Sequence, residues 1–288
     1  MRNIAHLFRG IVATLLFVAG AAHAQTIVTL GSGFQYPEGI AVEGSGNVFV
    51  ADANHNALKV ILATGGYATT QTVISGITPD GVAVDSAGNL YVADGNNSSV
   101  RKYTAASNYA SSQNIGSLFG YPFAIALDSA NNVYVADLNA TTIKKVTAAS
   151  GYTTVTALGS GFSNPSGVAV DAAGNIFVGD TSHNAVKKIV APDYTTINTL
   201  GSGFNQPNGV AVDGAGNVYV ADYGNNAVKK ILAAGGYTTV VPLGSGFNHP
   251  TDVDVDAAGN VFVTDSGNNA VKQIQTTTPV ALQSFSVD

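Results

Sequence analysis

The 288-residue sequence predicts an all-β fold, a six-bladed β-propeller with four antiparallel strands in each blade and a ring closed by the N-terminal strand. The first observation is an internal repeat whose opening proline returns every 42 or 43 residues, at Pro37, Pro79, Pro122, Pro165, Pro207 and Pro250. A repeat of this length with several short strands is typical of propeller blades. The second observation is that apolar and polar residues alternate between turn signals, as in half-buried strands. The third is a copy of the last strand of the repeat at residues 25–30, ahead of the first complete unit.

The unit that starts at Pro207 shows where the strands of a blade are expected. From the channel outward, we expect its strands at residues 210–212, 218–220, 227–231 and 237–243. Asp and Gly after the first strand suit a tight turn, because an Asp side chain can bond nearby backbone N–H groups and Gly adopts positive φ. Pro242 suits an outer strand, since proline cannot donate a ladder hydrogen bond.

The N-terminal strand predicts how the ring closes. Residues 25–30 and the Gly-Ser-Gly-Phe that follows copy an outermost strand and its connection. We expect this strand to pair with the last blade, whose own strands end near Ile274, because closure removes an exposed sheet edge that would invite aggregation. The propeller then spans residues 25–275, and residues 276–288 form a tail, an extra strand or the start of a linker.

The first 24 residues are expected to be a cleaved secretory signal peptide. Two arginines flank a positively charged start, residues 10–20 form a short apolar run, and Ala22-His23-Ala24 is a small-x-small cleavage site. The apolar run is shorter than the ~20 residues that span a bilayer, which argues against a membrane anchor. We therefore expect a secreted or periplasmic protein, cleaved after Ala24, with no membrane insertion.

Composition limits the partners. The sequence has no cysteine, so it can form neither a disulfide nor a thiolate metal site. Without the signal peptide the chain has 10 basic and 18 acidic residues, a net charge of −8. Nucleic-acid binding needs basic surfaces, so we expect no nucleic-acid partner. We expect a monomer.

The repeat resembles a known family. The pattern Pro-x-Gly-Val-Ala-Val-Asp-x-x-Gly-Asn-Val-Tyr-Val-Ala-Asp-x-x-Asn-Asn-x-Val, complete in residues 207–228, resembles NHL repeats, and the resemblance covers essentially the whole mature chain. It implies six blades of four strands, a scaffold found in secreted bacterial proteins, in sensor domains of receptor kinases and in a peptide-amidating lyase. The metal site of that lyase needs converging histidines, whereas His55 and His183 occupy matching turns of opposite blades, too far apart to share a zinc ion. The family shares a scaffold and not an activity, so function has to be argued from the site.

Charges that recur in every blade are expected to be architectural, and charges that occur once are candidates for function. Every blade has an acid at the end of its first strand and an Asp at the end of its second, and we expect these twelve to organise turns through backbone hydrogen bonds. All basic residues of the mature chain lie on third strands. We expect them to be solvated lysines and an arginine that protect sheet edges, with a polyanion site as the alternative.

Six acids remain, Glu38, Asp80, Asp193, Asp252, Asp254 and Asp288, and four of them point to the mouth of the central channel. Glu38 and Asp80 follow the opening prolines of blades 1 and 2, and Asp252 and Asp254 lie on the first strand of blade 6. These blades are neighbours in a closed ring, so the four acids should form one acidic arc. Asp254 is the sharpest departure from the repeat, because the other five blades have Ala there and a buried charge is costly unless paired or hydrated.

The other residues expected to bind a ligand at the mouth are Tyr36, Tyr121, Phe123, Ser166, Asn208, His249 and Thr251. Harmless variation of surface loops is the alternative explanation of all these positions. No catalytic set of residues stands out, so the sequence favours a secreted scaffold that binds a protein, peptide or glycan without a cofactor. The alternative is a Ca²⁺-dependent hydrolase or lyase at the channel mouth, since Ca²⁺ takes about six to eight oxygen ligands and the arc could supply them. Whether the protein is an enzyme stays open at this point.

Overall fold

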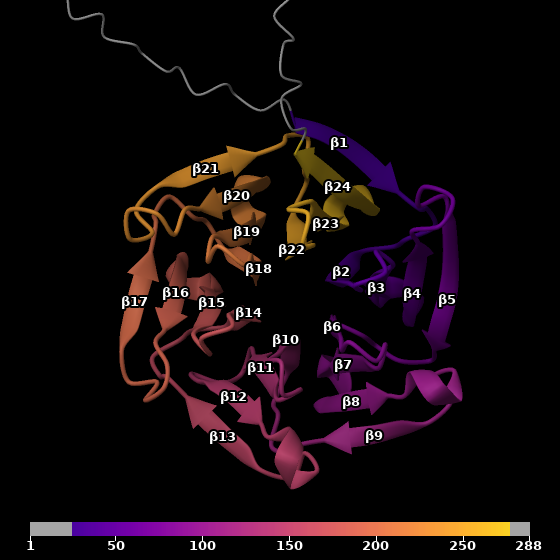
Figure 1. Ribbon diagram of the computed structural model, residues 1–288, viewed down its shortest axis with the longest axis horizontal. Helices are drawn as coiled ribbons and strands as arrows, with labels where there is room; N and C mark the ends of the chain where they lie inside the picture. The colour runs from indigo at the N-terminus through magenta and orange to yellow at the C-terminus, as the bar shows by residue number, and fades with distance from the viewer. Residues whose placement is uncertain (1–24, 277–288) are drawn as a thin grey trace, which may run out of the picture.

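The computed structural model describes residues 25–276, which form a closed ring of six blades around a central channel (Figure 1). Each blade is a four-stranded antiparallel sheet, and the expected fold class is confirmed. Numbered from the channel outward, the strands of blades 1 to 3 are β2 (Pro37–Val42), β3 (Val48–Asp52), β4 (Ala57–Leu62) and β5 (Thr69–Ser75); β6 (Gly81–Val84), β7 (Leu90–Asp94), β8 (Ser99–Tyr103) and β9 (Ser112–Ile115); and β10 (Pro122–Leu127), β11 (Val133–Asp137), β12 (Ile143–Val146) and β13 (Val155–Leu158).

Blades 4 to 6 repeat the order. Their strands are β14 (Pro165–Val170), β15 (Ile176–Asp180), β16 (Ala185–Ile189) and β17 (Ile197–Leu200); β18 (Pro207–Val212), β19 (Val218–Asp222), β20 (Ala227–Ile231) and β21 (Val240–Leu243); and β22 (Pro250–Val255), β23 (Val261–Asp265), β24 (Ala270–Thr276) and β1 (Gln25–Leu30). Short 3₁₀ turns connect some strands: η1 (Ala53–His55), η2 (Gly95–Asn97), η3 (Ala105–Ser107), η4 (Ala148–Ser150), η5 (Thr181–His183), η6 (Tyr223–Asn225) and η7 (Ser266–Asn268). The outer strand β21 begins later than expected, because Gly235, Gly236 and Tyr237 have positive φ and turn the chain there.

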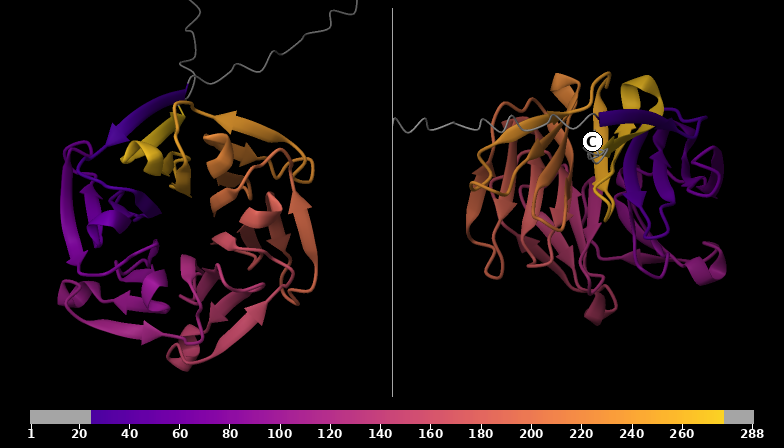
Figure 2. Two further views of the ribbon diagram at one scale, coloured as in Figure 1. Left: turned by 180° about the vertical axis from the view of Figure 1, so that it is seen from behind. Right: turned by 45° about the horizontal axis from the view of Figure 1, so that its top comes forward.

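The N-terminal strand closes the ring as expected. β1 pairs antiparallel with β24 from Gln25 opposite Thr276 to Leu30 opposite Val271, so both ends of the described chain meet in blade 6 (Figure 2). The expected signal peptide and residues 277–288 of the expected tail lie outside the described residues. Among the described residues, none of the helices is both long and apolar enough for a membrane span.

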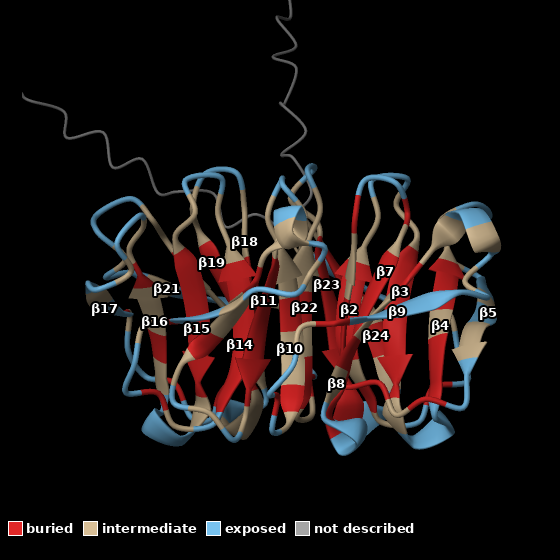
Figure 3. Ribbon diagram, turned by 90° about the horizontal axis from the view of Figure 1, so that it is seen from below, coloured by how far each residue is buried: buried red, intermediate tan, exposed pale blue. Residues whose placement is uncertain are grey.

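The core lies between adjacent blades. All residues of the six second strands are buried, whereas the loops on the two faces of the ring are exposed (Figure 3). At the closing seam, Leu30 of β1 and Phe262 of β23 pack with Ile40 and Ile61 of blade 1. Burying such side chains is worth about 1.5–3 kcal/mol each, which makes the blade interfaces the main source of stability.

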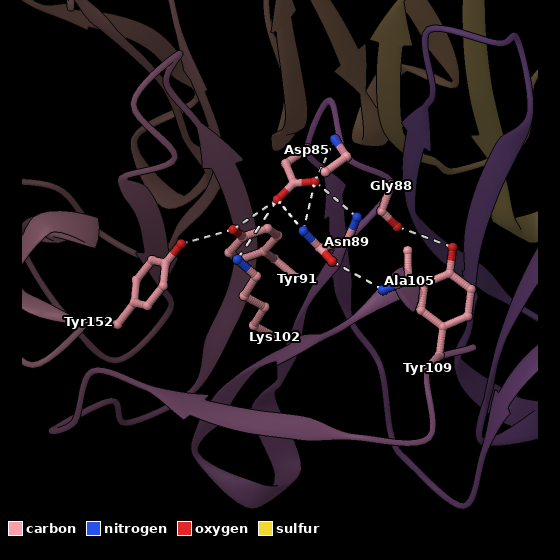
Figure 4. A network of polar contacts seen from close by, with 9 residues as sticks. Asp85, Gly88, Asn89, Tyr91, Lys102, Ala105, Tyr109 and Tyr152 are labelled. Carbon is pink, nitrogen blue, oxygen red and sulfur yellow. Dashed lines mark hydrogen bonds and ion pairs between the residues drawn. The ribbon is translucent and has the colours of Figure 1, made fainter. Parts of the chain in front are cut away.

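The recurring acids organise turns and connections. Asp85, at the end of β6, accepts hydrogen bonds from the backbone and the side chain of Asn89 and from the hydroxyl of Tyr91 (Figure 4). The Tyr91 hydroxyl also lies 2.9 Å from that of Tyr152 in blade 3, so this network joins two blades. The aspartates of the second strands bind the connection that leads into their own blade, as where Asn205 N donates to Asp222 at 2.8 Å.

The lysines of the third strands do not form a solvated edge, and that expectation is wrong. Lys59, Lys144, Lys187, Lys229 and Lys272 are only 13–19% exposed at the side chain and pair with the second-strand aspartates at 2.5–2.7 Å. Each also lies over a phenylalanine ring of the connection, 5.3–5.5 Å from its centre. The charges of these five lysines are therefore paired with aspartates inside the ring.

Candidate functional site

A hollow of about 250 Å³ lies at the channel mouth, on the face where the first strands begin. The first strand of each blade starts on this face, and the turns between second and third strands lie beside it, so all six blades can contribute side chains. The lining residues are Tyr36, Glu38, Phe123, Leu138, Asn164, Ser166, Thr181, Asn208, Tyr223 and Thr251.

Below the hollow, the central channel continues through the ring. Its volume is about 220 Å³, and its lining consists of the small and branched apolar residues of the first strands together with Asp252 and Asp254. A small space of about 10 Å³ lies at the throat between hollow and channel, bordered by Glu38, Asp80 and Phe123 among others. Asp252 of blade 6 also borders it, so the throat brings together acids of three neighbouring blades.

Glu38 and Asp80 form a hydrogen-bonded pair of carboxyl groups at this throat. Asp80 is buried and already accepts the backbone N–H of Gly95 at 2.6 Å and the Tyr121 hydroxyl at 3.2 Å. Two carboxyl groups can bond only if one carries a proton. Burial raises the pKa of Asp80 as well, but the hydrogen bonds from Gly95 and Tyr121 oppose that rise, so we assign the proton to Glu38. Burial, together with the charge of Asp80, raises the pKa of Glu38 far above its ordinary value. The pair therefore keeps one proton at neutral pH.

Three glycines make this arrangement sterically feasible. A Cβ on Gly39 would lie 2.6 Å from the carbonyl oxygen of Asp80, and one on Gly81 would lie 2.4 Å from that of Phe123. In blades 1 and 2, the glycine two residues after the opening proline thus lets neighbouring first strands approach closely. A Cβ on Gly95 would lie 2.4 Å from the Tyr121 ring and 2.7 Å from Asp80 Oδ2, so glycine there lets Tyr121 reach Asp80.

Aromatic side chains form the walls of the hollow. Tyr223, on η6 of blade 5, packs on the ring of His249 with 4.7 Å between centroids, and its hydroxyl bonds to that of Tyr36. Phe123 and Leu138 come from blade 3, two blades along the ring from Tyr36. A ligand in the hollow would lie between apolar walls, with Glu38 near the throat. Glu38 Oε2 and Asn208 Oδ1 are buried polar atoms without a hydrogen-bond partner among the described residues.

Asp252 borders the throat together with Glu38 and Asp80, so three of the four acids of the expected arc lie together, whereas Asp254 lines only the channel. Asp254 Oδ2 accepts the Val42 N–H at 2.8 Å and Oδ1 accepts that of Val255, while Asp252 binds Ile40 N at 3.1 Å and Val253 N in the same way. The innermost strand of a propeller has no partner on its channel side, so its free N–H groups attract these carboxylates. Burial raises the pKa of Asp252 to about 8 and that of Asp254 to about 6.

The structure brings six of the residues expected at the mouth around one hollow: Tyr36, Glu38, Phe123, Ser166, Asn208 and Thr251. Asp80 and Tyr121 lie directly behind Glu38, and His249 lies behind Tyr223. Ser166 and Thr251 are 3% exposed, and their hydroxyls are already hydrogen-bonded to neighbouring hydroxyls. That these residues bind a ligand stays a prediction.

Sequence reasoning missed four lining residues: Leu138, Asn164, Thr181 and Tyr223. Three of them directly follow the aspartate that ends a second strand. That position varies among the repeats, as Ala53, Gly95, Leu138, Thr181, Tyr223 and Ser266. Comparing it across the six blades would have identified it as a second ring of lining positions.

The donor set does not fit a preformed calcium site. Across residues 25–276, no group of three or more His, Asp or Glu side chains could hold a metal ion. Ca²⁺ needs about six to eight oxygens, whereas Asp80 already faces N–H and O–H donors and Glu38 holds a proton. His55 and His183 pair with Asp52 and Asp180 on their own turns and lie apart from the hollow.

Comparison with known proteins gives one matching family and a set of solved structures with the same fold. The model of the virginiamycin B lyase family matches residues 24–287. This match supports a propeller family and does not single out NHL repeats, so the NHL resemblance stays a hypothesis. No curated protein matches the sequence.

Solved structures share the fold at low identity. A gluconolactonase from Xanthomonas campestris has a TM-score of 0.74 and 12% identity, with 87% of this chain and 89% of that chain covered. A catalytically inactive histidine-to-alanine variant of virginiamycin B lyase from Staphylococcus aureus, with quinupristin, has a TM-score of 0.67 and 12% identity, with 88% and 100% covered. Regucalcin from Agrobacterium tumefaciens, a calcium-binding protein, has a TM-score of 0.67 and 14% identity, with 85% and 91% covered.

Proposed function

The chain belongs to the virginiamycin B lyase family, and from this membership and the geometry of the mouth we propose that it is a lyase or hydrolase whose proton donor is Glu38. The observation that supports the proposal is that the Glu38 carboxyl lies beside Asp80 at the edge of a hollow that can hold a small ligand, where burial raises its pKa far above the ordinary value. A carboxyl group of raised pKa can give a proton to a leaving oxygen near pH 7. A scaffold for cationic ligands would instead be served by ionised carboxylates.

The residues around Glu38 have distinct roles in this proposal. In the hydrolysis of an ester, water adds to the carbonyl carbon, the carbon–oxygen bond breaks, and the leaving oxygen takes the proton of Glu38. Glu38 then regains a proton from the added water. Asp80 stays ionised and raises the pKa of Glu38, while Tyr121 and the Gly95 N–H hold Asp80 in place. In an elimination, the carbon–oxygen bond breaks, the departing oxygen takes the proton of Glu38, and water takes the proton that leaves the neighbouring carbon as the double bond forms.

The hollow favours an uncharged cyclic ester. Its walls are aromatic at Tyr36, Tyr223 and Phe123, and the amide of Asn208 can bond a carbonyl or hydroxyl group. The volume of about 250 Å³ lies at the small end of ligand pockets, which span about 300–1,000 Å³. It therefore suits a compound of one or two rings, such as a lactone.

The residue assigned here differs from the histidine on which the activity of the named lyase depends. The Staphylococcus aureus enzyme is inactive when a histidine is replaced by alanine. In residues 25–276 no histidine lines the hollow, since His249 packs behind Tyr223. We therefore assign the proton transfer to a carboxyl pair and do not extend the substrate of that enzyme to this chain. No step is assigned to a metal ion.

A panel of lactones and cyclic peptide esters tests the proposal. The release of acid or of the opened product is measured for the wild type, Glu38→Gln and the distant control Tyr152→Phe. We expect Glu38→Gln to lower kcat/KM at least about 100-fold and the control to match the wild type, with EDTA without effect. Full activity in Glu38→Gln would contradict the assignment, and loss of activity in EDTA would restore the calcium-dependent alternative.

A binding scaffold is the second candidate, favoured by the apolar walls of the hollow. It predicts that panel compounds bind, as calorimetry would detect, but are not converted by the wild type. We also propose export to the periplasm or the exterior, which rests on the sequence of residues 1–24. Cell fractionation and N-terminal sequencing would test it, with Gln25 as the expected first residue.

A further inference from the structure

Blade 6 departs from the repeat at three positions where the other blades carry only Gly or Ala. These departures are Asp252, Asp254 and Thr264. The corresponding residues of blades 1 to 5 are Gly39, Gly81, Ala124, Gly167 and Gly209 for the first; Ala41, Ala83, Ala126, Ala169 and Ala211 for the second; and Ala51, Ala93, Ala136, Gly179 and Ala221 for the third. Each change places a polar group where the repeat needs none.

All three departures contact the same neighbour, strand β2 of blade 1. Asp252 and Asp254 accept its N–H groups at Ile40 and Val42, at 3.1 and 2.8 Å. The Thr264 hydroxyl donates to the carbonyl oxygen of Glu38 at 2.6 Å. Every bond therefore holds the backbone of the strand that carries the acid.

Two further hydroxyls of blade 6 complete the contact. Ser266 donates to the carbonyl oxygen of Pro37, and the Thr251 hydroxyl lies 3.0 Å from that of Glu38. Thr251, Thr264 and Ser266 are at most 3% exposed. Among the described residues, no other first strand has N–H groups bound by side chains of the preceding blade. We call Thr251, Asp252, Asp254, Thr264 and Ser266 the seam clasp.

The position of the clasp has a topological reason. Blade 6 is built from both ends of the chain: β22 to β24 come from the C-terminal side, while β1 leads directly into β2. No short connection joins β22 to β2, so their alignment depends on the non-covalent pairing of β1 with β24. Direct hydrogen bonds from β22 and β23 to β2 fix the alignment of these strands, which the chain connectivity does not.

We propose that Asp252, Asp254 and Thr264 are positioning residues that hold β2 against blade 6 and thereby fix the Glu38 carboxyl against Asp80. The catalytic meaning of this role rests on the proposed function, but the positioning can be measured without a substrate. The two carboxylates do not act as a cation site in the channel, since each of their oxygens already accepts a backbone N–H.

The test restores the residues of the repeat in the full chain, as Asp252→Gly, Asp254→Ala and Thr264→Ala together. The chain contains only two glutamates, Glu38 and Glu43, so ¹³C-labelled glutamate gives two carboxyl signals, and Glu38→Gln assigns them. We expect hydrogen exchange at Ile40 and Val42 to become at least tenfold faster and the titration midpoint of Glu38 to fall by one pH unit or more. If the triple variant does not fold, the single variant Asp254→Ala replaces it, and hydrogen exchange is then measured at Val42 alone.

Controls separate positioning from general destabilisation. Tyr152→Phe removes a contact between blades 2 and 3 on the opposite face and should change neither exchange at β2 nor the titration of Glu38 (Figure 4). Thr264→Ser keeps the hydroxyl and should behave as the wild type. In the active enzyme the triple variant should lower kcat about tenfold with little change in KM.

The outcomes are distinguishable. Unchanged exchange at Ile40 and Val42, or faster exchange with an unchanged Glu38 titration, would overturn the positioning role. If Glu38 of the wild type titrates near its ordinary value, it cannot serve as the proton donor and the proposed function is wrong. The exchange data would still decide whether the seam clasp holds β2.

Discussion

Replacing Glu38 with glutamine should make the folded ring more stable at neutral pH and remove its activity. Glutamine has the shape of the protonated acid and can donate an N–H to Asp80 in place of the O–H. It does not have to take up a proton on folding. In the wild type, burial raises the pKa of Glu38, so the folded state holds a proton at pH 7 that the unfolded chain releases.

The size of the effect follows from this linkage. An unfolded Glu ionises near a pKa of about 4.3, and each pH unit above that value costs about 1.36 kcal/mol in keeping the folded group protonated. At pH 7 the upper limit is about 3.7 kcal/mol. Water in the hollow reduces the penalty, so we expect Glu38→Gln to raise the free energy of unfolding by about 1–3 kcal/mol.

The pH dependence of unfolding checks the sign of this stability difference between Glu38→Gln and the wild type. The stabilising contribution of the protonated acid is complete below the unfolded pKa and is lost as pH rises toward the folded pKa. The gap between variant and wild type should therefore be small at pH 4, open through pH 7 and level off at higher pH. Urea unfolding at four pH values, followed by circular dichroism, measures the gap. A variant less stable than the wild type at pH 7, or a gap that does not grow with pH, would refute the shared proton.

Three further predictions follow from single contacts. Tyr121→Phe removes the hydroxyl that Asp80 accepts and should cost about 0.5–1.5 kcal/mol in urea unfolding and lower kcat/KM; unchanged values would show that the 3.2 Å contact is not formed in solution. Leu30→Ala, at a side chain only 1% exposed in the closing seam, should cost about 2–5 kcal/mol, and a loss below 1 kcal/mol would contradict closure by β1. Leu118→Gly should stabilise the ring by about 0.5–1 kcal/mol, because Leu118 is 85% exposed and has φ +64 where four other blades have Gly; a lower unfolding midpoint would argue for a role of this leucine.

The architecture could be predicted from the sequence because the repeat marks where each blade begins and where its strands lie. Six prolines at nearly constant spacing give the number of blades, and the unpaired strand at residues 25–30 gives the closure. The residues after the opening prolines were expected at the mouth because the start of a first strand is on one face in every blade. These predictions depend on backbone periodicity, which is local in sequence.

The chemistry of the acids could not be predicted in this way. The pairing of Glu38 with Asp80 depends on the absence of a side chain at Gly95, which lets Tyr121 reach the pair from blade 3. The direction of Asp254 depends on which N–H groups of β2 are free, a property of the neighbouring blade and not of its own repeat. The lysines were expected in solvent because their partners are aspartates seven residues earlier, on an adjacent strand.

In a repeat protein, the residues of one blade can be compared with those at the same positions of the other blades. Here the residues that differ from the repeat are clustered in space. Those of blade 6 are polar, are costly to bury, and all contact one strand of blade 1. Those of blades 1 and 2 put two carboxyl groups together at the throat. A ring selected for stability alone would keep Ala at residue 254 and a neutral side chain at residue 38, because both acids raise the free energy of the folded state at neutral pH. The destabilising acids lie at the channel mouth and at the seam between blades 6 and 1, next to Glu38. This clustering is the physical argument for a site built around Glu38.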